Sequence, residues 1–108
     1  MNIDKAQSIL KGVEQTRFSE LQLALFDAAM RYATLRSEYA LADAEARSDL
    51  EDSRTRAHDA FIDSCNILSR NMASREEDNS WRATAGNDRR ELGDLACFIQ
   101  LLLALKVR

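Results

Sequence analysis

Arginine, histidine and aspartate are the side chains whose spacing in this sequence could do chemistry, and they gather in two short stretches. Arg54 and His58 lie four residues apart in RTRAHDAFIDSCNILSR, and His58 is the only histidine. At about 100° per residue on a helix, His58 falls between Ile62 and Cys65, with Arg54 one turn before it. A core-facing stripe thus begins with two polar side chains. A buried histidine needs a polar partner, because desolvation disfavours its charged form and a nearby carboxylate favours it.

The second stretch, NDRRELGDLACF, supplies acidic partners for these two residues. Asp94 lies there beside Gly93, close to the apolar part of the segment. We predict a polar cluster of Arg54, His58 and Asp94 at one end of the core, where Gly93 would let two helices approach closely. Three readings of this cluster stay open, and we favour them in this order: a hydrogen-bonded network that sets helix register, a pocket for a ligand or partner, and a catalytic site.

Three more residues complete the candidate site: Trp81, Asp88 and Arg89. Trp81 is the only tryptophan and lies in a polar segment, where so large a ring must pack either on the bundle itself or on a partner. Asp88, followed three residues later by Glu91, resembles a capping box that would start a helix. The predicted binding residues are Arg54, His58, Trp81, Asp88, Arg89 and Asp94.

Recognised enzymatic motifs are mostly absent. The sequence has no glycine-rich phosphate loop and no HExxH, and one histidine without a suitable cysteine or acidic cluster cannot build an ordinary zinc site. Cys65 and Cys97 lack CxxC spacing and are expected to be reduced core thiols. We therefore predict no catalytic residue, no metal and no cofactor, and we lean against an enzyme.

One enzymatic alternative remains open. Small all-helical ribonucleases of the HEPN class use an arginine and a histidine separated by four to six intervening residues, in the cleft of a dimer. The segment from Arg54 to His58 resembles that motif. It departs from it in having only three residues between the two side chains and in lying mid-chain rather than near the C-terminal helix. The resemblance implies a dimeric ribonuclease using Arg54 and His58.

The elements that position these residues are predicted to be helices. The sequence has no proline and three glycines, too few for the tight turns of sheet-rich folds. From Phe18 to Ala46, apolar residues recur at alternating steps of three and four, which is typical of one long helix packed lengthwise on another. We predict an all-α helical bundle in a single domain, 1–108. Its approximately four helices are expected at 3–14, 18–47, 54–72 and 88–106, with a loop at 74–87.

The helix predicted at 88–106 is apolar on nearly every side and must therefore be buried all round. A four-helix monomer cannot cover it, and a second copy of the chain is the simplest cover. We predict a homodimer through this helix.

The net charge is −3, with both signs interspersed, and the sequence lacks the basic patch of a nucleic-acid binder. Without a signal peptide or an apolar segment long enough to span a bilayer, we expect a cytoplasmic protein with no membrane partner.

The two stretches quoted above are similar to a family of small all-helical bacterial proteins known only as a domain of unknown function. The similarity covers roughly the C-terminal half and is carried by His58, Asp59, Ala60, Ile62, Asp63, Asn66, Leu68 and Arg70, and by Asp88, Arg89, Gly93 and Asp94. The resemblance implies an all-α fold and a bacterial, cytosolic protein. It favours His58 and Asp94 as site residues and supplies no activity. The sequence thus predicts a non-enzymatic, dimeric module that binds a protein or a small molecule near His58, Trp81 and Asp94.

Overall fold

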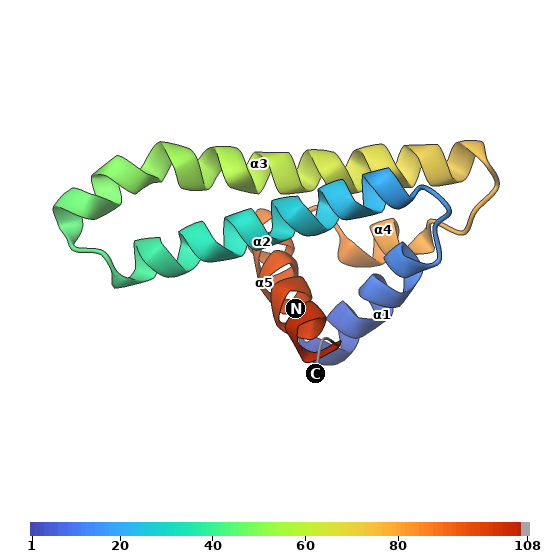
Figure 1. Ribbon diagram of the computed structural model, residues 1–108, viewed down its shortest axis with the longest axis horizontal. Helices are drawn as coiled ribbons and strands as arrows, with labels where there is room; N and C mark the ends of the chain where they lie inside the picture. Colours follow the sequence, from blue (N-terminus) through green and yellow to red (C-terminus); the bar gives the residue numbers. More distant parts are fainter. Residues whose placement is uncertain (107–108) are drawn as a thin grey trace.

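The computed structural model describes residues 1–106, and the regular elements within them are all α-helices (Figure 1). They are α1 (Ile3–Glu14), α2 (Ser19–Leu41), α3 (Ala44–Ser74), α4 (Ser80–Ala85) and α5 (Arg89–Lys106). The predicted all-α class is confirmed, with five helices in place of about four, because the segment predicted as a loop at 74–87 contains α4. Among residues 1–106, no helix combines the length and apolarity that crossing a membrane requires.

Helices α2 and α3 form a long antiparallel hairpin that runs the length of the molecule (Figure 1). With 31 residues, α3 is about 46 Å long at 1.5 Å per residue, and the longest extent of the molecule is 48 Å. The residues of the alternating apolar pattern on α2 are all buried or partly buried: Leu21, Leu25, Ala28, Tyr32, Leu35 and Tyr39. That pattern therefore marks the inward face of α2.

The turn of this hairpin lies earlier than the sequence pattern predicted. A helix was expected through 18–47 and the next from about residue 54, whereas the chain turns at Asp43. The Asp43 carboxylate accepts a hydrogen bond from the backbone N–H of Ala46 at 2.9 Å, which satisfies one of the free donors at the start of α3. Asp49, Asp52 and Ser53, residue types that also favour the start of a helix, lie inside α3.

Arg47 closes the other side of the turn. Its guanidinium donates hydrogen bonds to the backbone carbonyls of Tyr39 at 3.1 Å and Ala40 at 3.2 Å. These carbonyls belong to the last turn of α2, where the helix supplies no further backbone donor; that of Tyr39 also accepts from the backbone N–H of the cap residue Ala42 at 3.3 Å. The turn therefore forms from one capping aspartate and one arginine, with neither glycine nor proline to mark it in the sequence.

The segment after α3 contains the short helix α4, which packs against α1 and α3 through Trp81. Trp81 of α4 is only 4% exposed, and its indole N–H donates to the sulfur of Met72 at 3.3 Å. On the opposite side, a Cβ atom built on Gly12 of α1 would lie 2.7 Å from Cβ of Trp81. Of the two alternatives for Trp81, the structure supports packing on the bundle itself, because the ring has almost no surface left for a partner.

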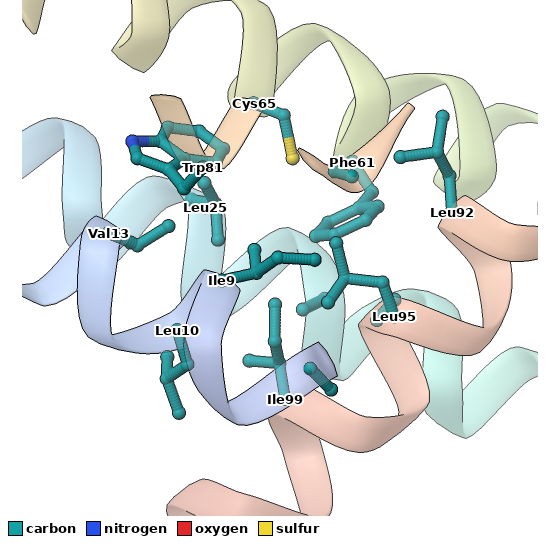
Figure 2. Close-up of a cluster of buried hydrophobic side chains, with 14 of the residues drawn as sticks. Ile9, Leu10, Val13, Leu25, Phe61, Cys65, Trp81, Leu92, Leu95 and Ile99 are labelled. Carbon is teal, nitrogen blue, oxygen red and sulfur yellow. The ribbon is translucent and has the colours of Figure 1, made fainter. Parts of the chain in front are cut away.

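The core is built from all five helices (Figure 2). Ile9 and Val13 from α1, Leu25 from α2, Phe61 and Cys65 from α3, Trp81 from α4 and Leu92, Leu95 and Ile99 from α5 are all buried. Helix α5 crosses α2 at a steep angle (Figure 1). It buries one side in this core, while Leu101 and Leu105 on another side are 46% and 50% exposed. Within the single chain, α5 is therefore not covered all round.

Candidate functional site

A cavity of about 490 Å³ opens between α2, α3 and the first turn of α5. Its lining residues are Tyr32 and Arg36 from α2, Arg54, Thr55 and His58 from α3, and Arg89 and Arg90 from α5. Tyr32 and Arg36 are four residues apart on α2, so both lie on one face of that helix. The same spacing places Arg54 and His58 on one face of α3. Four guanidinium groups from three helices thus converge on one hollow.

His58 forms the inner wall of this cavity and is 8% exposed. Its Nε2 lies 2.7 Å from the backbone carbonyl oxygen of Arg89. A carbonyl oxygen only accepts hydrogen bonds, so Nε2 carries the hydrogen. The imidazole also packs edge-on against the Tyr32 ring, with 5.0 Å between ring centroids. Its other nitrogen, Nδ1, is buried and has no hydrogen-bond partner within residues 1–106.

Arg54, which also lines the cavity, carries a second unpaired nitrogen. Its guanidinium stacks over the Tyr39 ring at 4.5 Å from the centroid, and Nη2 donates to the Glu51 carboxylate at 3.3 Å. Nε is buried without a hydrogen-bond partner among the described residues. A buried polar group left unpaired costs about 1–3 kcal/mol. Both unpaired nitrogens belong to side chains that line the cavity.

Three of the four arginines also contact a carboxylate. The ion pairs are Arg36–Asp94 at 2.8 Å, Arg54–Glu51 at 3.3 Å and Arg89–Asp59 at 2.7 Å. Arg90 forms no ion pair within residues 1–106. The three carboxylates are not among the residues that line the cavity, and ion pairs this exposed contribute little energy. The cavity wall therefore keeps a positive character that an anion can use.

Arg36 is held in place from the side away from the cavity. Burial lowers the pKa of the Arg36 guanidinium, but its hydrogen bond with Asp94 and the neighbouring Cys97 and Tyr32 outweigh this, so the pKa is raised overall. Nη1 of Arg36 also donates to Sγ of Cys97 at 3.7 Å. Burial raises the pKa of the Cys97 thiol, against the effect of Arg36. The guanidinium therefore remains charged, with its position set by α5.

Asp94 does not join the predicted cluster with Arg54 and His58. Its described polar partner is Arg36, on a helix that the prediction did not include. Gly93 does allow the expected close approach of two helices: a Cβ atom built there would lie 2.8 Å from the Tyr32 hydroxyl. At this crossing Asp94 is paired with Arg36 of α2, while Arg54 and His58 have other polar partners.

The structure brings together half of the predicted site. Arg54, His58 and Arg89 line the cavity, whereas Trp81, Asp88 and Asp94 do not. Asp88 is exposed and caps α5 by accepting a hydrogen bond from the backbone N–H of Glu91 at 3.0 Å. The positive end of the α5 dipole therefore lies beside Arg89 and Arg90.

Sequence reasoning missed four lining residues: Tyr32, Arg36, Thr55 and Arg90. One signal could have indicated two of them. Tyr32 and Arg36 have the same spacing as Arg54 and His58, and in a hairpin that turns at Asp43 both Tyr32 and Arg54 lie eleven residues from the turn. The misplaced turn hid this correspondence.

The chain offers no metal centre in the part that the structure describes, because residues 1–106 contain no group of three or more histidine, cysteine or acidic side chains placed to hold an ion. No family model, no curated protein and no solved structure matches this chain. The similarity to a bacterial family of unknown function therefore stays a prediction, and the site must be interpreted from its own chemistry.

Proposed function

We propose that this protein is a non-enzymatic helical module that binds an anionic small molecule carrying a phosphate group in the cavity between α2, α3 and α5. The observation behind the proposal is the convergence of four arginines on one hollow, with the buried Nδ1 of His58 and Nε of Arg54 left without partners. The planar guanidinium group presents donors that match phosphate oxygens two at a time. The volume of about 490 Å³ is within the range of small-molecule sites.

The two unpaired nitrogens suit a phosphate ester. Nε of Arg54 can only donate, and so it requires an acceptor oxygen. With Nε2 carrying the hydrogen, Nδ1 of His58 accepts from a protonated phosphate oxygen or, once protonated itself, donates to an ionised one. A phosphate group offers both kinds of oxygen near neutral pH, since its second pKa is about 6.

Titration of the protein with inorganic phosphate and with pyrophosphate, followed by calorimetry and by the His58 ring signals in NMR, tests this proposal. The single histidine needs no assignment. Arg90→Ala is the informative variant, because Arg90 is exposed and makes no ion pair within residues 1–106. Loss of one charged hydrogen bond should weaken pyrophosphate binding by about 10- to 100-fold.

Arg56→Ala is the matched control. Arg56 lies on α3 two residues after Arg54, is exposed, and does not line the cavity. Its removal changes the net charge by the same amount and should leave the affinity within about twofold, since distant exposed charges are screened. Equal losses in the two variants, or no binding of pyrophosphate to the unaltered protein, would contradict a specific site.

A second candidate function is a HEPN-like dimeric ribonuclease, which one observation favours: Arg54 and His58 line the same cavity. There the arginines would hold the phosphodiester, and Nδ1 of His58 would be the nitrogen free to move a proton. Incubation of pure protein with mixed RNA separates the two functions. Cleavage that is lost in His58→Ala and kept in Arg56→Ala would replace the binding module by the ribonuclease.

A further inference from the structure

A second cavity, of about 570 Å³, adjoins the cavity of the proposed phosphate site, because Arg36 lines both. We call this second cavity the corner, since it lies where α5 crosses α2 (Figure 1). Its principal lining residues are Arg36 and Ala40 from α2 and Asp94, Cys97, Phe98 and Leu101 from α5. The two cavities therefore meet at one arginine side chain.

One face of α5 connects the two cavities. Arg90 lines the cavity of the phosphate site, and Asp94, Cys97 and Leu101 follow it at steps of four, three and four residues. Residues at these steps lie above one another on one face of a helix. That face of α5 therefore runs from the phosphate site into the corner.

The corner is lined mainly by apolar side chains. Cys97, Phe98 and Leu101 contribute to its lining, and Leu101 is 46% exposed. The guanidinium group of the corner, from Arg36, is paired with the Asp94 carboxylate at 2.8 Å. Because these two charges offset each other, the corner suits an uncharged, apolar group and does not attract a second anion.

A group attached to a bound phosphate meets different surroundings on the two sides of the site. Along α3, the carboxylates of Glu51 and Asp59 are paired with two of the arginines, and an apolar group there would remove water from ions at a cost. At Arg36 the surface becomes apolar within one contact, since Nη1 lies 3.7 Å from Sγ of Cys97. An apolar group is therefore stable on the Arg36 side.

We infer, on the basis of the proposed function, that the ligand is a phosphate monoester with a single apolar chain, whose head binds the arginines and whose chain lies in the corner. One molecule then occupies both cavities, so that covering the corner requires no second association. The apolar face from Cys97 to Leu101 spans four residues, about 6 Å along α5, which is room for several methylene groups.

Calorimetric titration with butyl and octyl phosphate, below the concentration at which octyl phosphate forms micelles, tests the chain. Each methylene that the corner covers should raise the affinity about 2- to 4-fold, and octyl phosphate should bind about 20- to 200-fold more tightly than butyl phosphate. Octyltrimethylammonium carries the same chain on a cation and should not bind, because the arginines repel it. Equal affinities for butyl and octyl phosphate, or for octyl phosphate and octyltrimethylammonium, would overturn the inference.

Leu101→Gln separates the contribution of the chain from that of the head. It should lower the affinity for octyl phosphate about 5- to 20-fold and leave that for pyrophosphate within about twofold. Leu105→Gln is the matched control, because Leu105 is 50% exposed on the same helix and does not line the corner; its affinity for octyl phosphate should stay within about twofold of the unaltered protein. Both leucines are exposed and glutamine favours helices, so neither substitution threatens folding.

Pyrophosphate, titrated alongside, distinguishes failure of the chain from failure of the phosphate site. If pyrophosphate binds and octyl phosphate gains nothing over butyl phosphate, the inference is wrong and the phosphate site stands. If neither pyrophosphate nor octyl phosphate binds, both are wrong. A dimer in sedimentation that Leu101→Gln dissociates, with the affinity for octyl phosphate unchanged, would assign the corner to a second copy of the chain and overturn the inference.

Discussion

The crossing of α2 over α5 can be tested at Gly93, where the substitution Gly93→Ala sets two effects against each other. Gly93 is buried within α5, and replacing an interior helical glycine by alanine gains about 0.8–1 kcal/mol of helix propensity. The added Cβ would lie 2.8 Å from the Tyr32 hydroxyl oxygen and 3.3 Å from two of its ring carbons. Overpacking of this kind costs about 1–3 kcal/mol. The net expectation is a destabilisation of about 0.5–2 kcal/mol.

The hydroxyl group is responsible for the closest contact, and so Tyr32→Phe should relieve most of the strain. The remaining distance of 3.3 Å requires a shift of a few tenths of an ångström, which a ring edge can make. In the Tyr32→Phe background, Gly93→Ala should therefore be neutral or stabilising. The coupling free energy between the two substitutions should be about 1 kcal/mol or more.

Urea unfolding followed by circular dichroism, carried out on the four proteins of this double-mutant cycle, measures the coupling directly. The free energies are comparable only if the urea dependence is the same in all four. If Gly93→Ala stabilises the protein with Tyr32 intact, or if the two substitutions are additive within about 0.3 kcal/mol, then α2 and α5 do not meet at this point. The wall of the cavity between α2, α3 and α5 would then have to be placed differently.

Two further predictions concern stability. Burial raises the pKa of the Cys65 thiol to about 12 from its usual 9.0, so the folded state holds this proton where the unfolded state has lost it. The free energy of unfolding should therefore fall as pH rises above 9, by at most about 1.4 kcal/mol per pH unit from this group; urea unfolding at pH 8 and 10 should show a flatter dependence in Cys65→Ala. Arg47→Ala removes both hydrogen bonds to the end of α2 and should lower stability by about 1–2 kcal/mol, with faster amide exchange in residues 37–53. Unchanged exchange there would mean that water caps this end of α2 equally well.

Much of the helical architecture could be predicted because it depends on local chemistry. The absence of proline and the periodic apolar residues of 18–39 dictate helices whichever way they pack. The start of α5 was also readable, since Asp88 caps it by a bond that spans only three residues. Features of this kind depend on neighbours in the chain and leave a pattern there.

The hairpin turn shows where such reasoning failed. Asp43 and Arg47 end one helix and begin another through side-chain hydrogen bonds, and both are residues that also fit a helix interior. Two more aspartates, Asp49 and Asp52, follow in the next ten residues, and from the sequence each is an equally good cap. Only packing of the two helices against each other, and of α5 across them, selects the first of these positions.

The candidate site likewise combines features set by residues close in sequence with features set by the packing of distant ones. The spacing of four residues is enough to place Arg54 and His58 on one helix face that runs into the core, and it can be read without any structure. Which residues stand opposite was decided by tertiary structure: the register of the hairpin brings Tyr32 and Arg36 to the cavity, and the crossing at Gly93 brings Arg89 and Arg90. The physical reason is that helix register and crossing position are set by the summed packing of many side chains distant in sequence, whereas a helix face is set by the geometry of a single turn.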